Sequence, residues 1–361
     1  MFNSLEHTPQ RIVIVGDTHV SSDIMEDAVR ASRMKIADIK KVFWGPTDKT
    51  EFATQQLQLE KNGPDAVPYA QQLDALMKDA DVLLTHFCPV PGRLIQNSPH
   101  LKAILVCRSG VEHIDLAAAS QRNIPVIHVI RNAVPVAEFT LGLMLSVSRN
   151  IAVSHSLLMQ GRWKREYPNV THMRCLQNMT VGLLGLGNVG IELAVRLQAL
   201  GVSLLAYDEW LDKERLARHG LENIHIVPDK ETLFSQSDMV SLHLRLTPET
   251  QNSIDKRYFS LMKPTAYFIN AARGGLVKQE DLVEALKAGR IAGAALDVFD
   301  AEPLHPDAGL QELENVTITP HIAGETLEAL AHSPYLLLQA LDQILLQNVT
   351  ERIVNFSQID A

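Results

Sequence analysis

The chain has 361 residues, a formal net charge of −9 and three cysteines, and 46% of its residues are hydrophobic. At roughly 150 residues per domain, this length predicts two domains or three, each with a buried core. The acidic balance argues against nucleic acid as a main partner, because phosphate backbones attract basic surfaces. It leaves small anionic ligands open, since a few local arginines suffice to bind them.

The cysteines and the apolar segments bear on the compartment. Cys88, Cys107 and Cys175 are too few and too far apart for a disulfide framework or a set of metal ligands. We expect reduced thiols, mostly buried, and no metal. The first ten residues lack an apolar signal core, and apolar runs such as residues 139–147 fall far short of the roughly 18 residues that a membrane span needs. The sequence therefore predicts a cytoplasmic protein without a membrane partner.

The first part of the chain alternates short apolar runs with helical patterns. Strands separated by helices indicate a parallel sheet that is covered on both faces. Strands are predicted over residues 11–15, 81–85, 103–107 and 125–129. Helices are predicted over residues 23–32, 69–78 and 115–121. Residues 44–68, which hold glycines and prolines around a Gln/Glu-rich helix, are interpreted as an insertion or surface excursion.

The second part begins with a long helix. From residue 136 to about residue 160, the apolar spacing predicts one continuous helix of a length that commonly connects domains. The alternation of strands and helices restarts at Thr180 and continues to Pro320, and the chain from about Thr326 looks helical again. Two α/β blocks therefore meet near residue 135.

The sharpest local motif is Gly185-Leu-Gly187-Asn-Val-Gly190, which follows an apolar strand and precedes an amphipathic helix. Gly185 allows a tight turn, Gly187 lets the backbone approach a pyrophosphate, and Gly190 lets the helix and strand pack closely. The helix N-terminus would face the phosphates with its N–H groups. Asp208 ends the next strand, where a carboxylate receives the ribose hydroxyls and repels a 2′-phosphate. The motif therefore predicts a dinucleotide site that prefers NAD to NADP.

A second motif points to different chemistry. Asp17 and His19 follow the first strand, two residues apart, like the opening ligands of binuclear metallophosphoesterases. The sequence lacks the further Gly-Asp and Gly-Asn-His stretches that such enzymes need. We therefore interpret this segment as a strand-end turn in which the aspartate caps the backbone.

Three later strands are each followed by a segment that carries a reactive side chain, namely Arg273, Glu302 and His321. Ligands bind outside the carboxyl ends of the strands in a doubly wound sheet, so these side chains would converge near the cofactor. Arginine can hold the carboxylate of a 2-keto acid with two hydrogen bonds. Histidine, with an ordinary pKa of about 6.5, can protonate the alkoxide that hydride addition creates, and a glutamate beside it would favour the imidazolium.

A resemblance to a known family rests on longer stretches. These are VPVAEFTLGLML, VGLLGLGNVG, SLHLRLTPET, MKPTAYFINAARGGLV, IAGAALDVFDAEPL and TPHIAG. With them the chain resembles the D-isomer-specific 2-hydroxyacid dehydrogenase family, which includes phosphoglycerate dehydrogenases, most strongly from about residue 105 to residue 324. The resemblance implies that Arg273 binds the substrate carboxylate and carbonyl, that His321 is the acid/base, and that Glu302 tunes His321.

The resemblance also implies contacts to the cofactor and the substrate. Asn188 and Val189 would contact the pyrophosphate and Asp208 the adenosine ribose, while the Asp297 carboxylate would lie near the nicotinamide. The full set expected to bind NAD comprises Gly185, Gly187, Asn188, Val189, Gly190, Asp208, His243, Arg245, Ala271, Ala272, Arg273, Asp297, His321 and Gly324. The set expected to bind substrate comprises Arg108, Ser109, Gly110 and Arg273.

The family's organisation completes the expected architecture. The fold class is α/β, with two doubly wound parallel-sheet domains of Rossmann and flavodoxin type. Residues 1–132 and 326–361 would form the substrate-binding domain, and residues 133–325 an inserted NAD-binding Rossmann domain. The family also implies a homodimer formed around the long interdomain helix.

Two departures from the family pattern concern arginines. The usual His-x-Pro after the fourth strand is here His243-Leu-Arg245, and Arg245 is either a variant cofactor or phosphate contact or a solvent-facing side chain. The substrate loop, Arg108 to Asp115, is two residues shorter than usual, and we expect its backbone N–H groups to cradle the substrate carboxylate. Arg108 and Arg131 are either contacts to a distal acid or phosphate or ordinary surface cations.

The sequence thus predicts an NAD-dependent oxidoreductase that interconverts a D-2-hydroxy acid and its 2-keto acid, of the phosphoglycerate, hydroxypyruvate or glyoxylate type. The alternative is an NAD(H)-sensing, corepressor-like binding protein on the same fold. The intact Arg–Glu–His set favours the enzyme. A formate-type dehydrogenase is a weaker third interpretation, because the formate pattern has glutamine where Glu302 stands.

Overall fold

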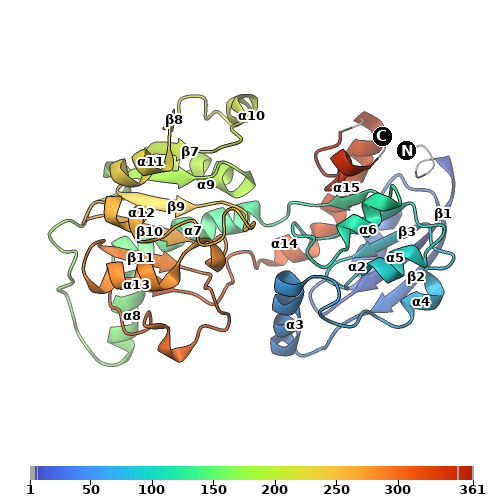
Figure 1. The fold of residues 1–361 in the computed structure, drawn as a ribbon, viewed down its shortest axis with the longest axis horizontal. Helices are drawn as coiled ribbons and strands as arrows, with labels where there is room; N and C mark the ends of the chain where they lie inside the picture. The colour runs from blue at the N-terminus through green and yellow to red at the C-terminus, as the bar shows by residue number, and fades with distance from the viewer. Residues whose placement is uncertain (1–4, 6, 348, 360–361) are drawn as a thin grey trace. The chain divides into compact units, whose positions relative to one another are not determined.

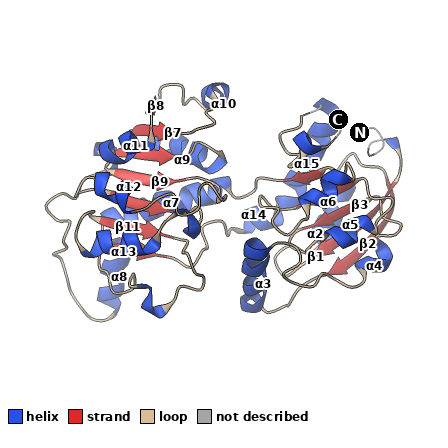
Figure 2. Cartoon of the chain, in the orientation of Figure 1, coloured by secondary structure: helices blue, strands red, loops and turns tan. Residues whose placement is uncertain are grey.

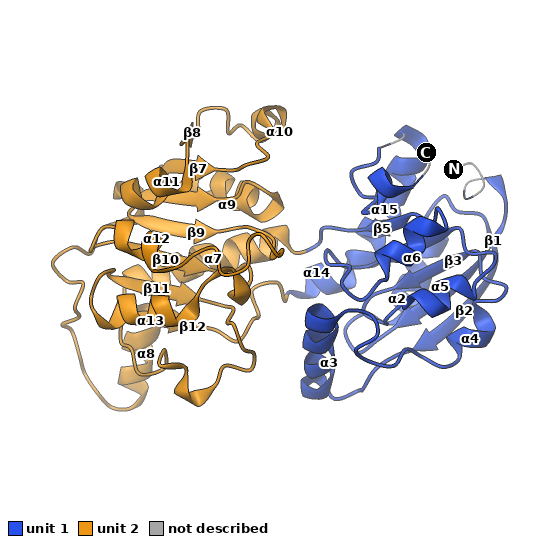
Figure 3. Ribbon diagram, viewed as in Figure 1, with its two compact units in different colours: residues 1–131, 326–361 blue, residues 132–325 orange. Residues whose placement is uncertain are grey.

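The fold was analysed in a computed structural model, which describes residue 5 and residues 7–347 and 349–359. The chain divides into two compact units, which Figure 3 colours separately. Unit 1 combines residues 1–131 with residues 326–361, and unit 2 is the continuous segment of residues 132–325. Much of the N-terminal segment for which the sequence predicts no signal core, residues 1–4 and 6, lies outside the described residues.

Unit 1 is built on a five-stranded parallel sheet in the order β2-β1-β3-β4-β5 (Figure 1). Its strands are β1 (Gln10–Gly16), β2 (Ile36–Phe43), β3 (Val82–Thr85), β4 (Ala103–Val106) and β5 (Val126–His128). Its helices are α2 (Ser22–Ala31), α3 (Lys49–Asn62), α4 (Leu73–Leu76), α5 (Gly92–Gln96), α6 (Leu116–Gln121), α14 (Leu327–Ala331) and α15 (Ser333–Gln347), with a 3-10 turn at Phe356–Gln358.

Both faces of this sheet are buried, which explains the continuous apolar runs of its strands. Side chains of a strand alternate between the two faces. Val13 and Leu83 belong to the cluster that α3 to α6 cover, whereas Ile14 and Leu84 belong to the cluster covered by α2 and α15. The C-terminal helix α15 therefore completes the core of the N-terminal sheet.

Three predictions for unit 1 differ from the structure. The edge strand β2 was missed, because its side chains are mostly exposed and include two lysines and an aspartate, an unusual pattern for a strand. Residues 44–68 are not a surface excursion, since Phe52 and Leu59 of α3 are fully buried in the core beside Trp44. The helix predicted over residues 69–78 is also shorter, and is confined to α4.

Unit 2 is built on a seven-stranded parallel sheet in the order β12-β11-β10-β9-β6-β7-β8. Figure 2 draws the strands in red and the helices in blue. Its strands are β6 (Thr180–Leu184), β7 (Ser203–Tyr207), β8 (His225–Ile226), β9 (Met239–Leu242), β10 (Tyr267–Asn270), β11 (Gly293–Leu296) and β12 (Val316–Ile318). Its helices are α7 (Ala133–Ser148), α8 (Ile151–Met159), α9 (Asn188–Ala199), α10 (Lys213–Arg218), α11 (Lys230–Gln236), α12 (Lys256–Leu261) and α13 (Gln279–Lys287), with 3-10 turns at Leu176–Asn178, Gly274–Leu276 and Pro306–Ala308.

The strand orders confirm the predicted class of two doubly wound α/β domains. In each sheet the chain runs outward in one direction, then returns to the centre and continues in the other. The direction reverses between β1 and β3 in unit 1 and between β6 and β9 in unit 2. A ligand site is expected outside the carboxyl ends of the strands at such a point.

The long helix predicted from residue 136 is broken in the structure. It consists of α7 and α8, which are bent by 67° at Asn150. Asn150 has a φ of 57°, a left-handed conformation that asparagine tolerates, and its buried side chain donates to Asn169 Oδ1 at 2.8 Å. α7 packs against α9 and β10 to β12, so it belongs to the core of unit 2. In the part of the chain that the structure describes, no single helix is long and apolar enough to cross a membrane, and only this bent pair reaches the required length.

Candidate active site

The glycine loop follows β6 and leads into α9. Gly185 has a φ of 99°, and a Cβ at this position would lie 2.7 Å from the carbonyl oxygen of His243. A Cβ at Gly190 would overlap the carbonyl of Gly185. At Gly187, by contrast, a Cβ would meet no atom within 4 Å. The loop is thus closely packed on the protein side and open at Gly187, as a pyrophosphate-binding turn requires.

Asp208 holds this loop from the end of β7. Its Oδ2 accepts a hydrogen bond from the Leu186 N–H at 2.6 Å, and its Oδ1 accepts one from the Trp210 N–H at 2.7 Å. Gly187 is the N-cap of α9 and offers no side chain, so the first N–H groups of the helix are not capped by a side chain from that position. An uncapped helix N-terminus of this kind attracts an anion.

His243 follows β9 and lies behind the glycine loop. The residue as a whole is half-buried. Its Nε2 atom is fully buried and forms no hydrogen bond within the described part of the protein. Burial lowers the pKa of His243 to about 4. Arg245, two residues on, is exposed, and its carbonyl accepts from the Thr250 hydroxyl at 2.7 Å. The open glycine turn, the uncapped helix, the carboxylate after β7 and this unpaired nitrogen together fit a dinucleotide.

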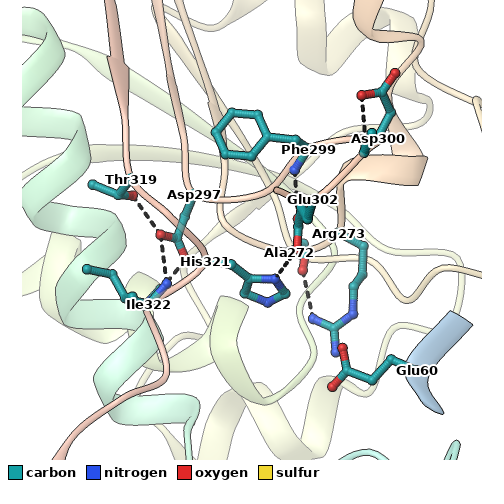
Figure 4. Close-up of polar contacts among 12 residues, drawn as sticks. Glu60, Ala272, Arg273, Asp297, Phe299, Asp300, Glu302, Thr319, His321 and Ile322 are labelled. Atoms are coloured by element: carbon teal, nitrogen blue, oxygen red, sulfur yellow. Dashed lines mark hydrogen bonds and ion pairs between the residues drawn. The ribbon is translucent and has the colours of Figure 1, made fainter. Parts of the chain in front are cut away.

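His321 follows β12 and pairs with Glu302, as Figure 4 shows. The Nδ1 atom of His321 lies 2.7 Å from Glu302 Oε2, while Glu302 Oε1 accepts from the Phe299 N–H at 2.9 Å. The carboxylate is thus fixed in orientation, and it holds Nδ1–H of the imidazole. Nε2 is then the nitrogen that can exchange a proton. The side chain of His321 is 33% exposed, so a ligand can reach it.

Asp297 holds the turn that carries His321. His321 has a φ of 56°, a conformation that a residue with a side chain rarely adopts and that the surroundings must enforce. Asp297 is fully buried, and its Oδ1 accepts from the Thr319 hydroxyl at 2.6 Å and the Ile322 N–H at 3.1 Å. Its Oδ2 accepts from the Ala323 N–H at 2.9 Å. The carboxylate that the resemblance places near the nicotinamide thus binds both sides of the histidine turn.

Arg273 follows β10 on the same edge of the sheet. Its loop is held by Asn270, whose amide accepts from the Ala272 N–H and donates to the Arg273 carbonyl, both at 3.0 Å. Gly274 packs so closely on Phe299 that a Cβ would overlap the Phe299 backbone. Since the Phe299 N–H also binds Glu302, the arginine loop and the histidine–glutamate pair are joined through one segment.

The substrate residues predicted in unit 1 lie in a different environment. Arg108 follows β4 and is only 6% exposed, so the interpretation as a surface cation is wrong. Its guanidinium lies 2.5 Å from Glu60 Oε1 and 3.3 Å from Glu112 Oε2, and stacks over the Phe87 ring. Two carboxylates therefore already balance its charge. Arg131 is half-buried and donates to the Ala329 carbonyl at 3.2 Å.

Ser109 and Gly110 complete the loop after β4. The Ser109 carbonyl bonds to Nδ1 of His128 at 2.6 Å, which ties the loop to the end of β5. A Cβ at Gly110 would meet the carboxylate of Glu112, the movable end of a side chain on the same loop.

A buried pair that the sequence did not predict lies at the direction change of unit 1. Asp17 Oδ1 accepts from the His19 and Val20 N–H groups, which confirms the predicted capping role. Asp17 Oδ2 also lies 2.8 Å from Nδ1 of His86, which follows β3. Burial lowers the pKa of His86 to about 4, so the ring is neutral near pH 7. No cluster of three metal-ligating side chains exists among the described residues.

Comparisons with known proteins agree with this geometry. Residues 141–323 match the family model for the NAD-binding domain of D-isomer specific 2-hydroxyacid dehydrogenases. The chain is 38% identical over 296 residues to a glyoxylate reductase of Thermofilum pendens, which covers 81% of this chain and 86% of the relative. The chain belongs to the D-isomer specific 2-hydroxyacid dehydrogenase family.

Further members of the family show how far the likeness extends. A D-3-phosphoglycerate dehydrogenase of Methanocaldococcus jannaschii is 35% identical over 292 residues, but the match spans 54% of that relative's length and 80% of this chain. The NAD-complexed structure of a D-isomer specific 2-hydroxyacid dehydrogenase from Lactobacillus delbrueckii ssp. bulgaricus has the same fold, with a TM-score of 0.73 at 23% identity, covering 95% of this chain and all of that one.

Family membership confirms the coarse functional prediction. The protein is an NAD-dependent 2-hydroxyacid dehydrogenase. The corepressor-like alternative is not favoured, since the named relatives are dehydrogenases and reductases. Which residues carry the reaction is a separate question, which the geometry of unit 2 addresses.

Proposed function

We propose that the protein interconverts a D-2-hydroxy acid and its 2-keto acid with His321 as the acid/base. The observation that carries this proposal is the 2.7 Å contact between His321 Nδ1 and Glu302, on the edge of the sheet that also carries the glycine loop. A histidine so oriented presents Nε2 for proton exchange, and the carboxylate stabilises the imidazolium.

The glycine loop and its neighbours would hold NAD. Gly185, Gly187 and Gly190 shape the turn for the pyrophosphate, with Asn188 and Val189 in the first turn of α9. Asp208 would receive the adenosine ribose, and its negative charge disfavours a 2′-phosphate. The remaining candidates for this site are His243, Arg245, Ala271, Ala272, Asp297 and Gly324. NAD, when bound, supplies the hydride in one direction and accepts it in the other.

The protein's own side chains would handle the proton and the acid group. In reduction, His321 Nε2 gives its proton to the keto oxygen as charge develops there, and in oxidation it takes that proton back. The nearby Glu302 carboxylate offsets the positive charge of the imidazolium. Arg273 would bind the substrate carboxylate through two parallel hydrogen bonds.

Unit 1 is proposed as the substrate-binding domain and unit 2 as the NAD-binding domain. Support comes from the loop after β4, where backbone N–H groups of Ser109 and Gly110 are candidates to cradle the substrate carboxylate. The guanidinium of Arg108 already forms ion pairs with Glu60 and Glu112. It would therefore bind an acid group of the substrate only if that group displaced one of these two carboxylates.

We also propose a cytoplasmic homodimer that has no membrane or nucleic-acid partner. Exposed apolar side chains on and after α8 support a dimer contact there, since patches of this kind commonly mark interfaces. They are Ile151, Leu158, Met159, Trp163 and Val170, which are 55–80% exposed. The net charge of −9 supports the absence of a nucleic-acid partner. Light scattering should give twice the monomer mass, and Trp163→Glu with Met159→Glu should give the monomer mass.

The direct test of the function is NADH oxidation with a panel of glyoxylate, hydroxypyruvate and 3-phosphohydroxypyruvate. At least one should be reduced, and Arg273→Lys should mainly raise its KM, since lysine cannot form the bidentate contact. Tight NADH binding without turnover of any 2-keto acid would favour the binding-protein alternative. An unchanged KM in Arg273→Lys would reject the role of the arginine.

A further inference from the structure

Arg215 of α10 reaches back to the glycine loop. Its Nη2 donates to the side-chain oxygen of Asn188, the first residue of α9, at 2.6 Å. The two residues are 27 positions apart, and α10 is joined to the loop by the segment that also carries Asp208. The backbone of Arg215 is itself fixed, because Asp212 caps α10 by accepting from the Arg215 N–H at 2.9 Å.

This contact determines which way the Asn188 amide faces. A guanidinium has only donors, so the group that meets it must be the amide oxygen of Asn188. The NH2 group of Asn188 is therefore turned away from Arg215. It offers two N–H donors beside the first backbone N–H groups of α9, which Gly187 leaves without a side-chain cap.

The charge of Arg215 is not balanced within the protein. Among residues 5, 7–347 and 349–359, Arg215 forms no ion pair, whereas Arg196 at the other end of α9 pairs with Glu192 and Glu138. A cation beside the positive end of a helix dipole is unfavourable by itself. A pyrophosphate at the same place would reverse this, because its negative charges meet both the guanidinium and the helix N-terminus.

We propose that Arg215 is a positioning residue for the pyrophosphate of NAD, which sets the Asn188 amide and supplies a positive charge next to it. The assignment rests on NAD binding alone and is independent of which keto acid is reduced. It also explains why α10, a six-residue helix with mostly exposed side chains, reaches the glycine loop through Arg215.

The test measures the Kd for NADH by fluorescence titration of the full chain. Arg215→Ala should raise the Kd for NADH about tenfold, since a charge-assisted hydrogen bond and its donor orientation are lost. Arg215→Lys, which keeps charge and a donor, should recover most of the affinity. Arg218→Ala is the matched control on the same helix, since its side chain is 63% exposed and only loosely paired with Asp212, and it should leave the Kd unchanged.

Two further measurements separate positioning from a structural role. Asn188→Ala should weaken NADH binding. The double variant with Arg215→Ala should raise the Kd by less than the product of the two single-variant factors. ADP-ribose, which keeps the pyrophosphate and lacks nicotinamide, should lose affinity in Arg215→Ala by the same factor. The melting temperature without ligand should not fall. An unchanged Kd for NADH or ADP-ribose, purely additive variants, or a lower melting temperature with no rescue by lysine would overturn the proposal.

Discussion

Both sheets are parallel and doubly wound, but they differ in the residues at the point where the strand order reverses. In unit 2 this point, between β6 and β9, has an open glycine turn and an uncapped helix. In unit 1 the corresponding point, between β1 and β3, holds the buried pair of Asp17 and His86, with Phe87 packed against the histidine. The two units thus place different groups at the reversal of strand order, an open glycine turn in one and a buried aspartate–histidine pair in the other.

The difference lies in the side chains at the strand ends. Glycines after β6 leave room for a ligand's phosphates, whereas at the ends of β1 and β3 the Asp17 carboxylate and Nδ1 of His86 form a buried pair. Fold topology therefore marks where a site can form, and the residues at that place decide whether it does. Substitutions around the two sites test this contrast in order of decreasing expected effect, and the removal of His321 itself follows at the end.

Apart from the removal of His321, Glu302→Gln should have the largest effect. It keeps the shape of the side chain but removes the charge that holds the His321 imidazolium. We expect kcat/KM to fall about a hundredfold, while the Kd for NADH stays the same. Steady-state kinetics across a pH series and a fluorescence titration measure the two quantities. Full activity in Glu302→Gln would remove the glutamate from the mechanism.

Gly187→Ala tests the open side of the glycine turn. A methyl group at this position meets no protein atom within 4 Å, so the variant should fold normally. It should nevertheless raise the Kd for NADH about thirtyfold, because the methyl group occupies the space of the pyrophosphate. Gly190→Ala is the contrasting variant, since its methyl group would overlap Gly185, and it should lower the melting temperature. Normal NADH binding by Gly187→Ala would place the phosphates elsewhere.

Asp297→Asn separates two roles for this carboxylate. Both carboxylate oxygens accept hydrogen bonds from the turn around His321. In asparagine an NH2 group takes the place of one oxygen, and it cannot accept a hydrogen bond. We expect kcat to fall about tenfold with no change in the Kd for NADH. Thr319→Val, which removes one of the three donors, should have a smaller effect. A raised Kd with unchanged kcat would instead support the nicotinamide contact.

The buried pair of Asp17 and His86 in unit 1 should affect the pH dependence of stability. Burial keeps the pKa of His86 at about 4 in the folded state, against an ordinary value of 6.5. The unfolded chain therefore binds the proton more tightly, and stability that is fully present above pH 6.5 is lost as the pH falls toward 4. This loss should be on the order of 1–3 kcal/mol.

Chemical denaturation at pH 7 and pH 5 measures that loss. His86→Phe should be less stable at both values, because Asp17 loses its partner, but the difference between them should shrink. His305→Phe, at an exposed position, is the control and should keep the dependence of the wild-type protein. An unchanged pH dependence in His86→Phe would mean that another group is responsible.

The sequence predicted the elements whose signals are local. The glycine turn, the strand ends with Arg273, Glu302 and His321, and the α/β class all follow from patterns within a few residues. It missed β2, whose exposed lysines hide an edge strand, and the bend at Asn150, which depends on a buried partner 19 residues away. Pairs such as Asp17 with His86 and Arg215 with Asn188 depend on the fold, which brings distant segments together.

The central claim is that His321 moves the proton at a site where NAD binds without its help. The most direct measurement takes one preparation of His321→Ala and determines both NADH affinity and turnover of the best 2-keto acid. The account predicts a Kd for NADH within about twofold of the wild-type value and turnover reduced by about a thousandfold. Turnover at the wild-type rate would contradict it, and so would a loss of turnover that is matched by an equal loss of NADH binding.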